Sequence, residues 1–130
     1  MTARRNVSSD SEFEAEVGYS RAVRVGPHVV VSGTTAPGDT AADQARNALL
    51  RIETALAEAG ASLSDVVRTR MFVTEISRWR EIGAVHAEAF GDIRPATTMV
   101  EVAALISPEL MVEIEADAYV SGEKEPSGPG

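Results

Sequence analysis

Residues 112–118 alternate strictly between apolar and acidic side chains, and this pattern constrains the fold more than any other feature of the sequence. The apolar members are Val112, Ile114, Ala116 and Ala118, and the acidic members are Glu113, Glu115 and Asp117. Successive side chains of a β-strand point to opposite faces, so the three carboxylates share one face. Like charges at this spacing repel one another. The acidic face is therefore either a solvated sheet surface or a place where arginines or a functional site compensate the charge.

The bulk composition limits the classes of partner. With 130 residues, of which 44% are hydrophobic, the chain suits one globular domain with a modest core. Its formal net charge of -8 disfavours nucleic acid and anionic membrane surfaces, because binding to either depends on basic residues. No apolar run reaches membrane-spanning length, and the absence of cysteine excludes disulfides and thiol catalysis. We therefore expect a cytoplasmic protein with no nucleic-acid or membrane partner.

Hydrophobic spacing and turn residues predict the order of the elements. A helical repeat of apolar residues begins after the capping candidates Asp39 and Thr40 and stops at Gly60. A second repeat follows Ser77, another capping candidate, and stops at Gly91. Strands are predicted over residues 19–25, 28–32, 65–74, 94–102 and 110–118. The order is thus strand, strand, helix, strand, helix, strand, strand.

This order indicates an α+β fold in which both helices cross one face of a single sheet. Segments 29–31 and 71–73 are nevertheless apolar on both faces, which is typical of strands buried on both sides. We expect the uncovered face to meet a neighbouring subunit in a homo-oligomer; the alternative is a sheet that curls over its own second face. The predicted organisation is a flexible segment over residues 1–17, one domain over 18–120 and a disordered tail over 121–130.

Five segments together resemble the Rid/YjgF family of reactive-intermediate deaminases. They are residues 18–22 (Gly-Tyr-Ser-Arg-Ala), 29–34, 66–73, 94–102 (Arg-Pro-Ala-Thr-Thr-Met-Val-Glu-Val) and 112–116. The resemblance implies a chorismate-mutase-like α+β fold and a homotrimer with three ligand clefts between its subunits. It also implies chemistry that needs no metal and no cofactor. Deaminating members hydrolyse 2-imino and enamine acids, such as 2-aminoacrylate, to 2-oxo acids and ammonia.

The resemblance assigns roles to individual positions. Tyr19 matches the tyrosine of the family's cleft, and Ser32 and Gly33 match the pair that ends the second strand beside it. Glu113 matches the glutamate that positions the attacking water. Met99 stands where many members have cysteine, and its backbone amide is expected to face the ligand. These residues are the expected binding and catalytic positions.

The sequence departs from the family at the carboxylate clamp. Deaminating members have arginine followed by serine or threonine where this chain has Thr97 and Thr98, and they usually have asparagine at the position of Gly83. A threonine hydroxyl donates one neutral hydrogen bond and does not replace the charge of a bidentate arginine. The chain therefore resembles a branch that lacks the arginine. Arg94 and Arg21 are the two candidates to supply the missing charge.

Glu113 is the candidate catalytic group. A carboxylate that orients and deprotonates water is ordinarily worth ~10²–10⁴-fold in rate. Burial in a cleft between subunits would raise the pKa of Glu113 toward a useful range. The alternative is that Glu113 only pairs with Arg68 or Arg70 of the same sheet.

The histidines and the tryptophan have simpler interpretations. Neither His28 nor His86 stands at a metal-ligand spacing from an acidic residue, so no metal site is expected. His86 lies on the apolar side of the second helix near Phe90 and is interpreted as a packed histidine. Trp79 and Ile82 are interpreted as core residues.

Three functions remain open from the sequence. The first is an imine or enamine hydrolase, or a related tailoring enzyme that acts on an electrophile without a carboxylate. The second is a trimeric module that binds a small molecule or a partner without catalysis; Thr97 favours this function or an altered substrate. The third is an endoribonuclease, an activity ascribed to some relatives; the net charge of -8 and the 5% aromatic content make it the weakest.

Overall fold

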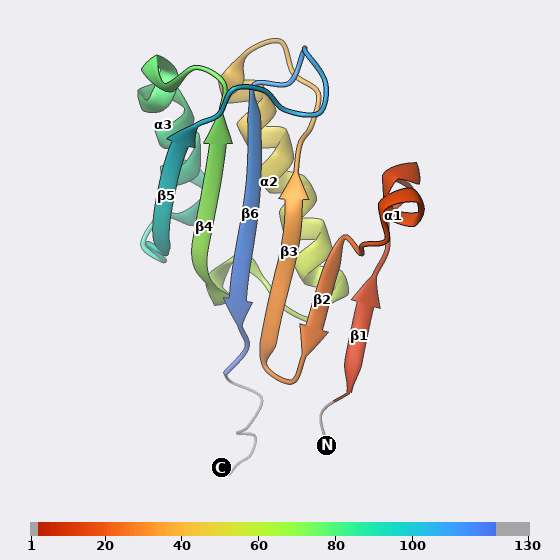
Figure 1. The fold of residues 1–130 in the computed structure, drawn as a ribbon. Coiled ribbons are helices and arrows are strands. Elements are labelled where there is room, and N and C mark those ends of the chain that lie inside the picture. The colour runs from red at the N-terminus through yellow and green to blue at the C-terminus, as the bar shows by residue number, and fades with distance from the viewer. Residues whose placement is uncertain (1–2, 122–130) are drawn as a thin grey trace.

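The computed structural model describes residues 3–121, which build one six-stranded sheet in the order β1-β2-β3-β6-β4-β5 (Figure 1). The strands are β1 (Arg4–Val7), β2 (Ala22–Val25), β3 (His28–Thr34), β4 (Val66–Val73), β5 (Ala96–Glu101) and β6 (Val112–Tyr119). The helices are α1 (Glu12–Val17), α2 (Ala41–Glu58) and α3 (Trp79–Phe90), with short 3₁₀ turns at Leu63–Asp65 and Ile76–Arg78. All strand pairs are antiparallel except β4 with β5.

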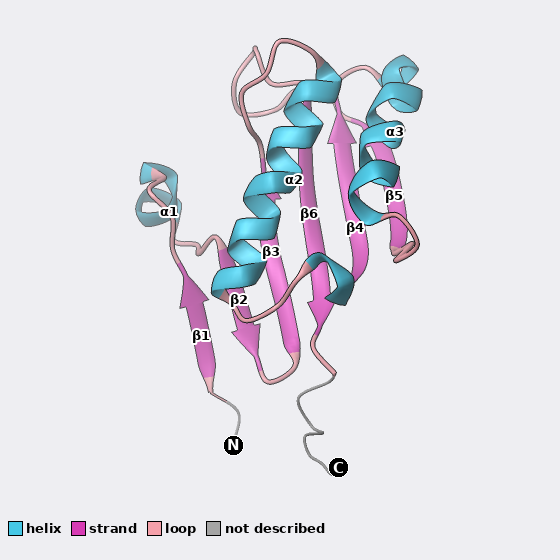
Figure 2. Cartoon of the chain, turned by 180° about the vertical axis from the view of Figure 1, so that it is seen from behind, coloured by secondary structure: helices cyan, strands magenta, loops and turns pink. Residues whose placement is uncertain are grey.

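Helices α2 and α3 lie side by side on one face of the sheet, and neither crosses the opposite face (Figure 2). The short helix α1 stands beyond the end of β1, at the edge of the sheet (Figure 1). The predicted α+β architecture with two helices on one face is therefore confirmed. We call the opposite side the helix-free face.

The core lies between the sheet and α2. Strand β6 presents its four apolar residues to the helices, each at most 3% exposed, while its three acidic residues lie on the helix-free face. Helix α2 meets them with a stripe of small and branched residues, which lets the helix approach the sheet closely. The stripe comprises Ala41, Ala45, Ala48, Leu49, Ile52, Ala55 and Leu56. The alternation read from the sequence thus assigns both faces of β6 correctly.

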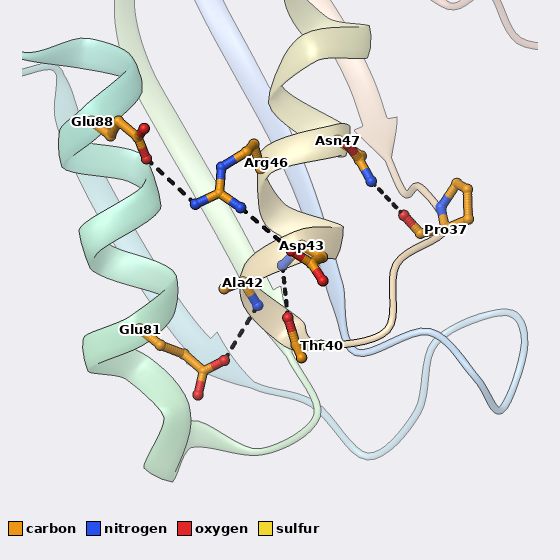
Figure 3. A network of polar contacts seen from close by, with 8 residues as sticks. All are labelled: Pro37, Thr40, Ala42, Asp43, Arg46, Asn47, Glu81 and Glu88. Carbon is orange, nitrogen blue, oxygen red and sulfur yellow. Dashed lines mark hydrogen bonds and ion pairs between the residues drawn. The ribbon is translucent and has the colours of Figure 1, made fainter.

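Polar contacts fix the start of α2 and tie it to α3 (Figure 3). The Thr40 hydroxyl accepts a hydrogen bond from the Asp43 backbone N–H at 3.0 Å, as expected of a capping residue. The Ala42 backbone N–H donates to the Glu81 carboxylate of α3 at 3.3 Å. One turn further on, Arg46 lies 3.5 Å from Glu88. These contacts join the two helices on their solvent side.

The amino-terminal segment contains elements that the sequence did not predict. Strand β1 extends the sheet by pairing with β2, and Val7 is only 7% exposed. Ser11 then caps α1, and Gly18 ends it with φ 88°, a left-handed conformation that favours glycine. One buried valine in a polar sequence is too weak a pattern to predict a strand. The expected tail over 121–130 lies outside the described residues except for Ser121.

The start of α3 also differs from the expectation. Ser77 does not cap the helix, because residues 76–78 form a 3₁₀ turn and α3 begins only at Trp79. Trp79 is 48% exposed, so its interpretation as a core residue is wrong; the Arg80 guanidinium stacks on its ring at 4.5 Å. Ile82, at 1% exposure, is a core residue as expected. None of the described helices is long and apolar enough to span a membrane.

Candidate functional site

The three carboxylates of β6 have different surroundings. Arg70, on the neighbouring strand β4, lies 2.8 Å from Glu115 and 3.8 Å from Asp117 and so compensates both. The Glu113 side chain makes no ion pair or hydrogen bond within the described part of the chain, and Phe72 stands opposite it in register. The alternative in which Glu113 pairs with Arg68 or Arg70 is therefore not observed.

Glu113 is partly buried, and its surroundings perturb its ionisation. Desolvation is the largest influence and raises the pKa of its carboxyl group. The positive charge of Arg21 lowers this pKa, and the negative charge of Glu115 raises it. The net direction is upward, as expected from burial. A carboxylate with a raised pKa is better suited to accept a proton than an exposed one.

Gly33 makes room for this carboxylate. Strand β3 carries one extra residue between Val31 and Thr34 relative to β6, which is a β-bulge, and Gly33 lies within it. A Cβ atom at position 33 would overlap the Glu113 carboxylate and lie 2.9 Å from its Cδ. The position therefore requires glycine for close approach. The neighbouring Ser32 turns its hydroxyl to the backbone and donates to the Ser20 carbonyl at 2.6 Å.

Several predicted site residues share one cavity with Glu113. The cavity has a volume of about 730 Å³ and is lined by Tyr19, Arg21, Gly33 and Glu113. Its other wall comes from the amino-terminal segment, including Phe13. Sequence reasoning missed this wall, because a segment interpreted as flexible carries no pattern that assigns it to a pocket. We call this cavity the Glu113 pocket.

The residues around position 97 form a second cavity of about 430 Å³, which contains His86, Arg94 and Thr97 but not Glu113. Thr97 pairs with Thr69 in register, and their hydroxyls lie 2.8 Å apart on the helix side of the sheet. Within a single chain, position 97 and Glu113 thus face opposite sides. We call this second cavity the Thr97 pocket.

His86 is packed as expected, and it is also hydrogen-bonded. Its ring lies 4.5 Å from that of Phe90, and its Nε2 lies 2.8 Å from the Thr69 hydroxyl. Desolvation lowers the pKa of His86, so the imidazole is neutral near pH 7. At the Thr97 pocket, His86 and Thr97 therefore present a neutral imidazole ring and a hydroxyl group.

The other two predicted site residues on β5, Thr98 and Met99, lie on opposite faces of the sheet. Thr98 is exposed and pairs in register with Arg70, which lies on the helix-free face. Met99 packs against the core. No group of three potential metal ligands occurs among residues 3–121.

Comparison with known proteins identifies the family. The family model described as Endoribonuclease L-PSP matches residues 9–120. The crystal structure of Rv2704 from Mycobacterium tuberculosis, described as a member of the YjgF/YER057c/UK114 family, matches with a TM-score of 0.90 and 70% identity. That match covers 91% of this chain and 100% of the other. The chain belongs to the Rid/YjgF family.

Other members of the Rid/YjgF family match over much of the chain. A RutC family protein of Pyrococcus abyssi is 33% identical over 110 residues, which cover 78% of this chain and 85% of that protein. The 3-aminoacrylate deaminase RutC of Acinetobacter baylyi is 39% identical over 83 residues, which cover 64% of each protein. The structural match to Rv2704 confirms the expected YjgF-type α+β fold.

Proposed function

We propose that this Rid/YjgF protein binds a small electrophilic metabolite and hydrolyses an imine or enamine to a carbonyl product and ammonia. The observation that carries the proposal is Glu113, which is the one β6 carboxylate not paired with Arg70. It lines a cavity that also contains Tyr19, and its pKa is raised by burial. A partly buried carboxylate without a partner destabilises the folded protein, and such groups with a raised pKa are typical of functional sites.

The chemistry needs one well-placed base. An imine takes a proton from solvent at nitrogen, and an enamine takes one at carbon, so both give an iminium ion. Glu113 takes a proton from water while the water oxygen adds to the C=N carbon, which gives a carbinolamine. Glu113 passes this proton to nitrogen and takes the hydroxyl proton as the C–N bond breaks, so ammonia leaves, the carbonyl forms and the last proton returns to solvent. Tyr19 lies in the same cavity and offers a phenolic hydroxyl to the ligand or the water. Water supplies every atom added, so these steps need no cofactor.

We further propose that the protein is a homotrimer in which the Glu113 pocket of one subunit meets the Thr97 pocket of the next. Support comes from exposed apolar side chains on the helix-free face: Val30 is 48% exposed, Val100 41% and Tyr119 43%. Surfaces of this kind are typical of contacts between subunits. In such an assembly, residues on opposite sides of one chain would line one cleft.

The first test is direct turnover. A lyase or an amino-acid oxidase generates 2-aminoacrylate or another 2-imino acid in solution, and loss of the intermediate is followed with and without the protein. Because its named relative acts on 3-aminoacrylate, that enamine belongs in the same panel. A rate no faster than hydrolysis in buffer with every substrate would contradict the proposal.

The second test assigns the base. Glu113→Gln keeps the shape of the side chain but cannot accept a proton, so turnover should fall by about 10²–10⁴-fold. Glu115→Gln is the matched control on the same strand and face. It alters the ion pair with Arg70 and should leave most of the turnover. Equal losses in the two variants would show that Glu113 has no special role.

A binding module without catalysis is the second candidate, and Thr97 favours it. This function predicts saturable binding of a small molecule with no turnover in the panel above. Thr97→Arg separates the two cases, because a guanidinium at this position can clamp a carboxylate. The appearance of 2-imino acid hydrolysis in this variant would show that the remaining machinery is intact. Continued silence would favour the binding module.

A further inference from the structure

Arg21 lies in the Glu113 pocket with much of its guanidinium unpaired. Its Nη2 donates to the Gly33 carbonyl oxygen at 2.6 Å, which anchors the group beside the bulge of β3. Its Nε is buried and has no hydrogen-bond partner. Within residues 3–121, Nη1 also makes no hydrogen bond. The guanidinium is thus held by one of its five N–H donors and by a cation–π contact with Tyr19, whose ring centroid lies 5.9 Å from Cζ.

Glu113 does not neutralise Arg21, although both line one cavity. No ion pair joins them in the described chain, yet the charge of Arg21 is felt at Glu113, whose pKa it lowers. The two charges are therefore near but not in contact. This leaves a space in which a ligand can meet both the guanidinium and the carboxylate.

The other charges around the cavity are less suited to hold a ligand. Asp10, Arg51 and Glu58 line the same cavity but are exposed, so solvent and salt screen them. Arg51 also donates to the Thr35 carbonyl at 2.8 Å. Arg21 is the partly buried cation of the cavity, and its charge is the least screened.

Arg94, the other candidate to supply the missing charge, lies elsewhere. It is exposed and lines the Thr97 pocket, on the side of the sheet opposite Glu113. Within one chain, Arg21 shares a cavity with the proposed base and Arg94 does not. The Arg94→Gln variant therefore tests for a contribution of Arg94 across the proposed subunit contact.

We propose that Arg21 binds the anionic group of the ligand, a carboxylate, in the Glu113 pocket and so supplies within one subunit the charge that position 97 lacks. A guanidinium fork matches the geometry of a carboxylate, and an ion pair with low solvent exposure is worth more than a surface pair. The inference rests on the proposed function in taking the Glu113 pocket as the ligand site. It makes Arg21 a residue that determines specificity for acids.

The test compares a carboxylate with a neutral molecule of similar shape. Pyruvate and pyruvamide are titrated into the full-length protein and into Arg21→Gln, and binding is followed by calorimetry or NMR. Loss of a charge-assisted contact should weaken pyruvate binding by roughly 10–150-fold and leave pyruvamide binding nearly unchanged. Arg21→Lys keeps the charge and should retain part of the affinity. Arg46→Gln, on the outer side of α2, is the control for the loss of one positive charge.

A second readout separates binding from a structural role. Arg21→Gln removes the charge that lowers the pKa of Glu113, so the acid limb of the pH–rate profile should move to higher pH. A variant that only loosened the fold would lower activity without this shift. Unchanged pyruvate affinity in Arg21→Gln would overturn the inference. So would a result in which Arg94→Gln loses pyruvate affinity and Arg21→Gln does not.

The outcomes also separate the inference from the proposed function. If Glu113→Gln keeps full turnover while Arg21→Gln loses pyruvate binding, Glu113 is not the base but the carboxylate site stands. If Glu113→Gln loses turnover while Arg21→Gln binds pyruvate as before, the base stands and the carboxylate site is refuted.

Discussion

At position 113 a carboxylate is kept partly out of water, and this burial affects folding as well as chemistry. Because its pKa is raised in the folded protein, the folded state binds the proton more tightly than the unfolded state. Ionisation therefore opposes folding. The penalty is absent below the unfolded pKa, near 4.5, and it grows as the pH rises through the folded value.

Glu113→Gln should consequently stabilise the fold at pH 7 while it removes turnover. Thermal melts of the variant and the parent should coincide at pH 3 and separate as the pH increases, with the variant melting higher. Glu115→Gln loses its ion pair with Arg70 and should not show this gain. A Glu113→Gln protein that is less stable than the parent at pH 7 would indicate that the carboxylate has a favourable partner.

Arg94 occupies a left-handed conformation with φ 52°, which costs a non-glycine residue about 1–2 kcal/mol. Arg94→Gly should therefore raise the free energy of unfolding by about 1 kcal/mol, as measured by urea denaturation. Arg94→Ala keeps the strained backbone and is the matched control, so it should show no such gain. Equal stability in both variants would show that the loop relaxes at no cost.

At the scale of elements, the bulge of β3 is what admits the carboxylate of β6. Gly33→Ala places a methyl group against the Glu113 side chain, whose far end is flexible and moves aside. We expect turnover to fall by about 10-fold or more, because a base displaced by even 1 Å loses its alignment. The melting temperature should change little. A large loss of stability with normal turnover in the folded fraction would contradict this picture.

Gln44 links α2 to the loop that precedes β6. It is 2% exposed; its amide nitrogen donates to the carbonyls of Gly38 and Glu109, and its amide oxygen accepts from the Met111 N–H at 2.8 Å. Gln44→Ala leaves these buried groups unpaired and should cost about 3 kcal/mol in urea denaturation. Asn47→Ala, which removes one exposed hydrogen bond from the same helix, should cost less than about 1 kcal/mol.

Elements with strong periodicity could be predicted from the sequence, whereas weakly patterned ones could not. The alternation in β6 and the alanine-rich repeat of α2 each repeat a local pattern several times. These patterns therefore predicted which face of the sheet packs on the helices and which face carries the acidic residues. The only buried apolar residue of strand β1 is Val7. Gln44 is a polar residue within the apolar stripe of α2, because its side chain hydrogen-bonds backbone groups that are distant in the sequence. Such features arise from tertiary contacts, which local patterns do not encode.

The candidate site was predictable in its chemistry but not in its arrangement. The alternation identified the acidic face of β6, and the resemblance to the family singled out Glu113 on it, together with Tyr19 and Gly33. Which arginine pairs with which acid depends on the register of β4 against β6, and this register is set by the bulge after Val66. No spacing within the sequence distinguished Arg21 from Arg94 as the cation of the Glu113 pocket.

At the scale of the whole molecule, the helix-free face predicts self-association. Light scattering should give a mass of about three copies of the 13.8 kDa chain. Val30→Lys puts a charge among the exposed apolar residues of this face and should shift the mass toward one copy. Leu50→Lys, at a similarly exposed position on α2, is the control and should keep the assembly. A parent protein with the mass of one chain would refute the trimer.

One wall of the Glu113 pocket is built by residues that precede α1 and by α1 itself, far in sequence from the acid they enclose. This segment touches the sheet chiefly through β1, so its side chains are free to vary without disturbing β6. Under the proposed function, substitutions in residues 8–13 should therefore change which small molecules bind, while the strand that carries Glu113 stays the same.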